Sequence, residues 1–144
     1  MRFMVLVKAT AQSEAGILPD SKLLESMGKF NAELANAGVL LAGEGLQPSS
    51  KGVRLKFSGE RPAIIDGPFA ETKELVAGFW IIAAKSMDEA VEWMARSPFQ
   101  NSEEIEIRRI YEAEDFGPAL TPELSEQEER LRAKTAAGEK RGAV

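Results

Sequence analysis

The sequence contains neither cysteine nor histidine, two residue types that carry much of protein chemistry. Without cysteine, the chain can form no disulfide, thiol nucleophile or thiolate metal site. Without histidine, it lacks the commonest general base and a common ligand of zinc and haem, and the usual Ser-His-Asp triad cannot form. Any metal would have to be held by carboxylates and carbonyls, which favours magnesium or calcium. We therefore predict that the protein uses no metal and no other cofactor.

Positive charge is also scarce. Eighteen lysine and arginine residues stand against 23 aspartate and glutamate residues, which gives a formal net charge of -5. Binding to nucleic acid needs a clustered positive field, so we predict no nucleic-acid partner. One basic group is interpreted as the solvated face of a hairpin, and it consists of Lys51, Arg54, Lys56 and Arg61.

Long apolar runs and nucleotide-binding motifs are missing as well. The N-terminal apolar run is interrupted at Lys8 and is too short for a secretion signal or a membrane span. We therefore expect a cytoplasmic protein with no membrane partner. Gly43-Glu44-Gly45 lacks the rest of a phosphate-binding loop, and the chain has no Gly-x-Ser-x-Gly elbow.

The chain instead contains strand and helix patterns in turn, over a length of 144 residues that is typical of one domain. Alternating apolar residues predict strands, and apolar residues at three- and four-residue spacing predict helices. Residues 10–19 are expected to form a loop. In chain order the predicted elements are a strand at 3–9, a helix from Asp20 or Ser21 that ends before Gly38, a strand at 39–46, a hairpin of 53–57 and 62–66, a strand at 76–84, a helix that begins with a capping box at Ser86, and a strand at 105–111.

This order predicts an α+β fold, the ferredoxin-like βαββαβ plan with an inserted hairpin. After Tyr111 the composition changes to an acidic connector at 112–118 and a charged helix through about Lys134, followed by a frayed tail. Only Leu124 and Leu131 give that helix an apolar seam. We therefore divide the chain into a ferredoxin-like domain at 1–118 and a C-terminal charged helix and tail at 119–144.

The predicted strand at 76–84 is apolar on both faces. Its two faces consist of Val76, Gly78, Trp80, Ile82 and Ala84, and of Ala77, Phe79, Ile81 and Ala83. The two helices of the plan can cover only one face of the sheet. A second copy of the chain, with its sheet packed against this one, is the simplest cover for the other face, so the pattern predicts a homodimer.

The stretch Asp66-Gly67-Pro68-Phe69 fits neither an ordinary strand nor a helix. Asp66 follows two β-branched residues at a strand end, Gly67 permits a tight turn, and Pro68 fixes its own φ and removes a donor. One interpretation is structural: Asp66 caps its own loop amides, and Phe69 fills the core. The other is functional: Asp66 lies in a pocket among apolar residues such as Phe69 and Trp80, where it could act as a general base.

Further candidates have the same two kinds of interpretation. Glu44, between two glycines at a strand end, is either a solvent-facing acid at a bulge or a second carboxylate that converges with Asp66. Lys73 either pairs with neighbouring acids or anchors a substrate. Trp80 either belongs to the core or lines a cavity. We predict Asp66 and Glu44 as the catalytic candidates, and Gly67, Phe69, Lys73 and Trp80 as the ligand-binding candidates.

The motifs Asp66-Gly67-Pro68-Phe69-Ala70-Glu71-Thr72-Lys73-Glu74, Gly78-Phe79-Trp80 and Gly43-Glu44-Gly45-Leu46-Gln47-Pro48 closely resemble the DGPF branch of the YCII-related family. The resemblance covers roughly residues 1–118, and 112–118 are similar to an extension found in some members. It implies a dimeric α/β-barrel of ferredoxin-like subunits, in agreement with the homodimer predicted from the pattern.

The resemblance also implies two directions for function. Some members of the wider YCII group are enzymes, including a dehydrochlorinase that acts on chlorinated aromatic diols. Its smaller members carry a His and an Asp on and near the first helix, but Met27 and Asn36 occupy those places here, so that pair cannot be carried over. DGPF-type members are often described as partners of alternative sigma-factor systems, which implies bacterial regulation.

Two hypotheses follow. The first is a dimer that binds a small molecule or serves as a regulatory accessory protein of sigma-factor-linked systems. The alternative is a cofactor-independent lyase or isomerase that acts on a small aromatic or anionic molecule, with Asp66 as base and Glu44 as its partner.

Overall fold

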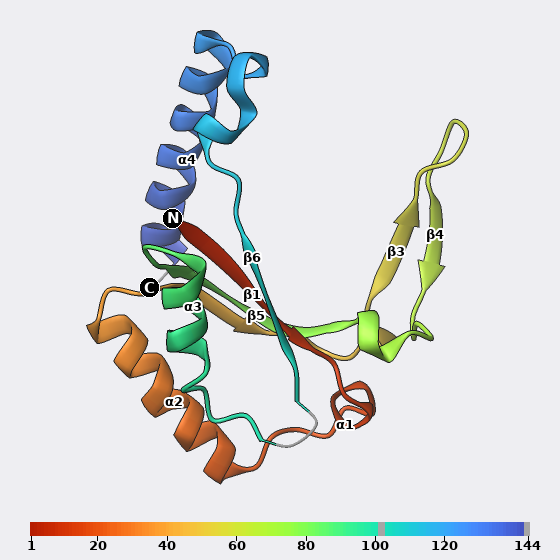
Figure 1. The fold of residues 1–144 in the computed structure, drawn as a ribbon. Coiled ribbons are helices and arrows are strands. Elements are labelled where there is room, and N and C mark those ends of the chain that lie inside the picture. The colour runs from red at the N-terminus through yellow and green to blue at the C-terminus, as the bar shows by residue number, and fades with distance from the viewer. Residues whose placement is uncertain (101–102, 143–144) are drawn as a thin grey trace. The chain divides into compact units, whose positions relative to one another are not determined.

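The computed structural model describes residues 1–100 and 103–142, and the chain divides into two compact units, Met1–Ile110 and Tyr111–Val144 (Figure 1). The expected boundary at residue 118 falls inside the second unit. The first unit holds the sheet, the hairpin and all the predicted site residues.

The first unit is built on a four-stranded antiparallel sheet with the strand order β2-β5-β1-β6. The strands are β1 (Arg2–Lys8), β2 (Leu40–Gly45), β5 (Val76–Ala83) and β6 (Ile105–Arg109). Helix α2 (Ser21–Asn36) joins β1 to β2, and helix α3 (Met87–Met94) joins β5 to β6. The mixed α+β class and the order of these elements are therefore as the sequence predicts.

Local signals in the sequence set the helix ends. The Asp20 side chain accepts a hydrogen bond from the Leu23 amide at 2.8 Å and begins α2, and Gly38 follows its end with φ 71°. Ser86 caps α3 by accepting from the Glu89 amide at 3.1 Å. In a capping box the Glu89 carboxylate would accept a hydrogen bond from the Ser86 amide. Here it accepts one from the amide of the preceding residue, Lys85.

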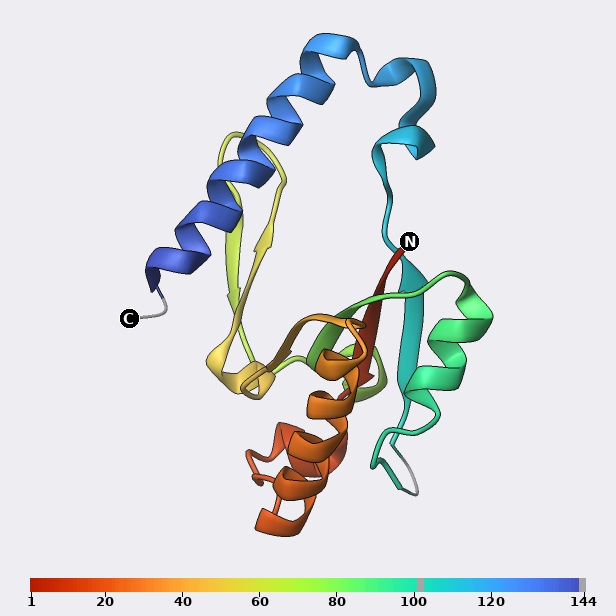
Figure 2. The same ribbon diagram turned by 90° about the vertical axis from the view of Figure 1, so that its left-hand side faces the viewer.

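Helices α2 and α3 lie on the same face of the sheet (Figure 2). The side chains between helices and sheet form the core, with Phe3 and Val5 from β1 and Trp80 and Ile82 from β5 at its centre. The helices contribute chiefly Phe30, Leu34, Ala90 and Met94. The pattern of the strand at 76–84 predicts two apolar faces, and this is the one that the helices cover.

The opposite face of the sheet, here called the open face, is apolar at its centre and half-buried. Met4 and Leu6 of β1 pair with Ile81 and Phe79 of β5, and directly paired residues of an antiparallel ladder share a face. Across the four strands the two rows on this face are Glu44–Phe79–Leu6–Glu106 and Ala42–Ile81–Met4–Arg108. The open face thus has an apolar centre with charged or small residues at both edge strands.

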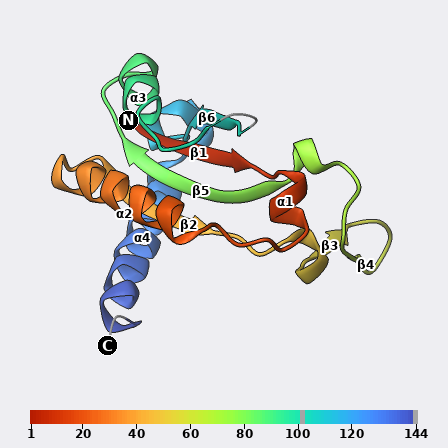
Figure 3. The ribbon, with the colours of Figure 1, turned by 90° about the horizontal axis from the view of Figure 1, so that it is seen from below.

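The inserted hairpin consists of β3 (Val53–Lys56) and β4 (Ala63–Asp66), which form a separate two-stranded sheet. We call this hairpin the arm. Figures 1 and 3 show it reaching out beyond the end of the main sheet. The alternation at 53–57 predicts a half-exposed strand with its apolar side turned inward, but every residue of β3 and β4 is exposed. The pattern identifies an apolar side correctly, but this side stays largely exposed, with Val53, Leu55 and Ile64 at 60%, 53% and 70%.

Short helical turns connect these elements. Residues 10–19, expected to be a loop, contain the one-turn helix α1 (Ala11–Glu14), in which Thr10 and Ser13 form a capping box. A 3₁₀ turn at Ser49–Lys51 precedes the arm, and another at Thr72–Glu74 follows it. The turn before the arm contains Ser49.

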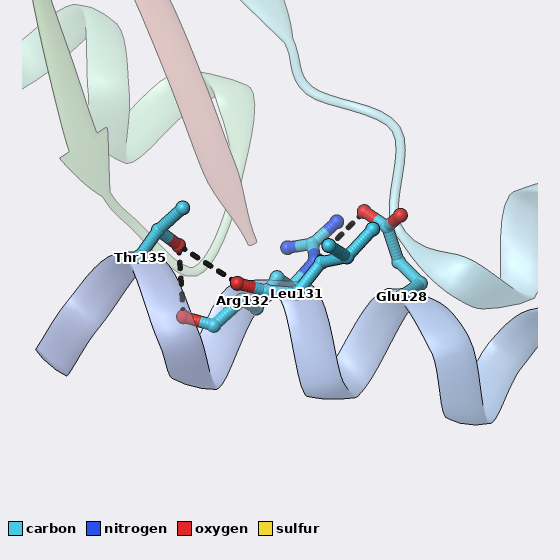
Figure 4. Close-up of polar contacts among 4 residues, drawn as sticks. All are labelled: Glu128, Leu131, Arg132 and Thr135. Atoms are coloured by element: carbon cyan, nitrogen blue, oxygen red, sulfur yellow. Dashed lines mark hydrogen bonds and ion pairs between the residues drawn. The ribbon is translucent and has the colours of Figure 1, made fainter. Parts of the chain in front are cut away.

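The second unit contains a 3₁₀ segment (Ala113–Ala119) and the long helix α4 (Pro122–Gly142). The helix was expected to end near Lys134 with a frayed tail, but it continues to Gly142. Alanine-rich sequence after Leu131 has high helix propensity, which accounts for the extension. Contacts one turn apart occur within the helix as far as Thr135, including Arg132 Nε to Glu128 Oε1 at 3.2 Å and Thr135 Oγ1 to the Arg132 carbonyl at 2.9 Å (Figure 4). No helix in the described part of the chain is long and apolar enough to cross a membrane.

Candidate functional site

The base of the arm is fastened to the rest of the unit by a side-chain network around Ser49. The Ser49 amide donates to Glu14 Oε1 at 3.1 Å, and the Ser49 hydroxyl donates to Glu14 Oε2 at 2.5 Å. The same hydroxyl oxygen accepts a hydrogen bond from the Phe69 amide at 3.1 Å. Glu14 on α1 thereby holds both chain segments that enter and leave the arm.

Gly67 lies at the centre of this base. Its amide donates to the Gly52 carbonyl at 3.0 Å, and the peptide bond to Pro68 is cis. A Cβ atom at Gly67 would lie 1.8 Å from the Ser49 carbonyl oxygen, which no side chain can tolerate. The glycine predicted to bind a ligand is therefore required for the close approach of two backbone segments.

Asp66, the main catalytic candidate, is the last residue of β4 and pairs with Val53 across the arm. It is exposed, and within the described residues its carboxylate has no hydrogen bond or ion pair. The cap on its own loop amides, one of its two interpretations, does not form there, and Trp80 lies in the core. Its neighbour Phe69 is half-buried outside the core, with the Arg54 guanidinium 3.8 Å above its ring centroid.

Glu44 lies on the main sheet, opposite Phe79 and therefore at the β2 edge of the open face. Its side chain is exposed, and no hydrogen bond or ion pair links it to Asp66 in the part of the chain that the structure describes. The two carboxylates belong to different sheets, Glu44 to the main sheet and Asp66 to the arm. The Lys73 side chain lies outside the described residues.

Trp80 belongs to the core, with 6% of its surface exposed. Its Nε1 donates to Asn31 Oδ1 on α2 at 2.9 Å, which satisfies the only polar atom of the indole. Phe30 and Phe99 pack edge-on against the indole, with ring centroids 6.1 Å and 5.9 Å away. A Cβ atom at Gly43 would lie 2.7 Å from the ring, so the glycine before Glu44 admits the indole.

A groove of about 550 Å³ lies between α3 and β6. Its lining is mostly apolar, with Ser97 and Glu103 as polar members, and comprises Met87, Val91, Met94, Ala95, Ser97, Phe99, Glu103, Ile105 and Ile107. Phe99 contacts both this groove and Trp80. The sequence interpretation missed the groove. A signal for it was present, because the apolar residues at 87, 91 and 94 together with Ile105 and Ile107 form an apolar strip wider than the buried face of one helix.

Glu106 forms ion pairs on the open face with Lys8 and with Arg108, whose Nε lies 3.8 Å from Glu106 Oε1. Lys8 Nζ is 2.9 Å from Glu106 Oε2 across β1 and β6. The hydrogen bond to Lys8, reinforced by its charge, lowers the pKa of Glu106 below the ordinary value of 4.5. The same hydrogen bond raises the pKa of Lys8 above 10.5. No cluster of three or more acidic side chains that could hold a metal ion occurs in the described residues.

These features define a class: an α+β protein with a four-stranded antiparallel sheet, two helices on one face, an open apolar face and an inserted arm. The family model of the YCII-related domain matches residues 1–114. The chain therefore belongs to the YCII-related domain family.

Two individual proteins show a more limited similarity to the chain. The uncharacterized protein R00369 of Rhizobium meliloti (strain 1021) is 32% identical over 74 residues, which are 51% of this chain and 60% of that protein. A solved structure of 5-chloro-2-hydroxyhydroquinone dehydrochlorinase from Burkholderia phenoliruptrix AC1100, in complex with 2,5-dihydroxybenzoquinone, aligns with 78% of this chain and 96% of its own. The TM-score is 0.37 and the identity 17%, values that carry no conclusion about this chain's chemistry.

Proposed function

We propose that this YCII-related protein is a homodimer of the DGPF branch that binds a small, mostly apolar molecule and acts as a binding or regulatory accessory protein. The observation that carries the proposal is the open face of the sheet. The helices cover the other face, so the apolar centre of the open face stays only half-buried. This centre consists of Met4, Leu6, Phe79 and Ile81.

The dimer would be a barrel of two ferredoxin-like subunits with their sheets packed face to face. The strand order β2-β5-β1-β6, with antiparallel neighbours and both helices on one face, supports the ferredoxin-like plan. Burial of apolar surface stabilises association by roughly 25 cal/mol per Å² before the costs of binding, so burial of the apolar centre of the open face would favour the dimer.

The ligand site proposed here is the groove between α3 and β6. Ligand sites are commonly apolar hollows with a few polar groups that fix orientation. The groove has this composition, with Ser97 and Glu103 as the polar groups, and Phe99 connects it to the aromatic cluster around Trp80. Service to a bacterial sigma-factor system is the regulatory role that the family resemblance implies, and it is proposed on that ground alone.

The alternative, a cofactor-independent lyase or isomerase with Asp66 as base, is less well supported. A general base needs a substrate pocket and a group that orients it. Asp66 is exposed on the arm, and neither Asp66 nor Glu44 lines the groove. The binding function is therefore preferred.

A thermal-shift screen of small aromatic and aliphatic molecules tests the site. The wild type is compared with Val91→Asn in the groove wall and with Asp66→Asn on the arm. We expect a ligand to raise the melting temperature of the wild type and of Asp66→Asn, but not of Val91→Asn, because the apolar wall supplies the contact.

Two outcomes would contradict the proposal. A ligand that stabilises Val91→Asn as much as the wild type does not bind in the groove. A shift that is lost only in Asp66→Asn would place the site at the arm carboxylate and favour the enzyme.

A further inference from the structure

We propose that the arm clasps a second copy of this chain, with its apolar side packed on that copy. The inference rests on the proposed homodimer and adds a specific contact to it. The arm occupies residues 53–66 and belongs to the same compact unit as the sheet.

The arm has two unlike sides. The register pairs Leu55 with Ile64 and Arg54 with Ile65, so alternate residues fall on opposite sides. One side is mostly apolar: Val53, Leu55 and Ile64 on it are 60%, 53% and 70% exposed, and Asp66, paired with Val53, lies on it at the base of the arm. The other side carries Arg54, stacked on Phe69, and Lys56. An isolated two-stranded hairpin is at best marginally stable in water, so an apolar side this exposed indicates a missing partner.

The base of the arm directs it away from its own core. Glu14 holds Ser49, and Ser49 holds the Phe69 amide, so both ends of the arm are fastened to the same unit. In Figure 1 the helices lie on one side of the sheet, and the arm rises from the far end of the sheet on the other side. A second copy packed on the open face would lie beside the arm. Because the arm is already held in place, little ordering entropy opposes this contact.

Position and charge favour a second copy of the chain as the occupant. The arm, residues 53–66, carries three basic residues, Arg54, Lys56 and Arg61, and two acidic ones, Glu60 and Asp66, which gives a formal charge of +1. The whole chain has a net charge of -5, so the remainder carries -6. Arg54 and Lys56 lie on the side opposite the apolar one, so this charge difference favours the approach of two copies rather than the apolar contact itself.

Two neighbouring isoleucines provide a matched test. Ile64 lies on the apolar side of the arm and Ile65 on the side with Arg54. We compare Ile64→Asn with Ile65→Asn by sedimentation equilibrium, using the full chain. Ile64→Asn should raise the dimer dissociation constant by about tenfold to a hundredfold, because two copies of the side chain lose an apolar contact. Ile65→Asn should change the constant by less than about threefold.

A second measurement does not depend on whether the fold tolerates asparagine at position 64. The chain has no cysteine, so the single thiol of Ile64→Cys reports on one position alone. Its reaction with a maleimide should be slow at protein concentrations above the dissociation constant and fast below it. An equal rate at both concentrations would overturn the inference.

Failure of the arm contact can be told from failure of the dimer. If the wild type is a monomer, both proposals fall. If the wild type is a dimer that Ile81→Asn on the open face disrupts, while Ile64→Asn keeps the wild-type constant, only the arm contact is wrong. Equal weakening by Ile64→Asn and Ile65→Asn would also overturn it, because the effect would not belong to the apolar side.

Discussion

At the scale of single residues, the glycines of this chain have very different roles. Gly67 brings the end of the arm against the Ser49 carbonyl, and a Cβ atom would lie 1.8 Å from that oxygen. Gly28, in the middle of α2, has no atom within 4 Å of the corresponding position. The first is required by backbone packing, whereas the second only weakens its helix.

Gly67→Ala and Gly28→Ala should therefore have opposite effects on stability. We expect Gly67→Ala to lower the free energy of unfolding by about 3 kcal/mol, because rigid backbone atoms must move apart. Gly28→Ala should raise it by about 0.5 to 1 kcal/mol, since alanine is the better helix former. Urea unfolding followed by circular dichroism measures both. A stable Gly67→Ala variant would show that the base of the arm is not closely packed.

The Lys8–Glu106 pair makes a prediction about pH. Lys8 lowers the pKa of Glu106 in the folded chain, so the pair stabilises the fold above the unfolded pKa of about 4.5 and loses this effect as pH falls through the lower folded value. The pKa of Lys8 is raised in the folded chain. The stability that Lys8 contributes is therefore present below 10.5 and is lost as pH rises through its folded pKa.

Glu106→Gln should accordingly melt at a lower temperature than the wild type at neutral pH. The difference should shrink as pH falls below 4.5, where the wild-type carboxylate becomes protonated. Thermal melting of both proteins across this range is the measurement. A difference that persists unchanged in acid would mean that packing of the side chain, rather than its charge, is responsible.

At the scale of elements, regular helices and strands could be predicted because their signals are local. Asp20, Gly38 and Ser86 mark helix ends, and the strand at 76–84 shows two apolar sides, of which the helices cover one. The arm shows the limit of such patterns. Alternation at 53–57 reveals an apolar side, but not whether the same chain covers it.

The candidate site illustrates the same limit. The sequence singles out the stretch from Asp66 to Phe69 correctly as unusual, and Gly67 as a tight point. This stretch is unusual because the Phe69 amide contacts Ser49, which in turn contacts Glu14. Ser49 and Glu14 lie 20 and 55 residues before Phe69, so no local pattern indicates that they approach it. The groove between α3 and β6 likewise depends on two segments that meet only in three dimensions.

At the scale of the whole molecule, one sheet face is packed by helices and the other is left with an apolar centre. The helix-covered face contains the fully buried residues Phe3, Val5 and Ile82. On the open face, Leu6 and Phe79 lie between Glu44 and Glu106. Face-to-face packing of two copies would bury this apolar centre and keep the acidic residues at the edges, an arrangement typical of interfaces with a polar rim.

The molar mass of the wild-type chain in solution tests this proposal most directly. Size-exclusion chromatography with light scattering at micromolar concentration should give twice the chain mass of 15.7 kDa. Ile81→Asn, which places a polar group at the centre of the open face, should shift the mass toward that of a single chain. A wild-type mass of 15.7 kDa under these conditions would contradict the homodimer.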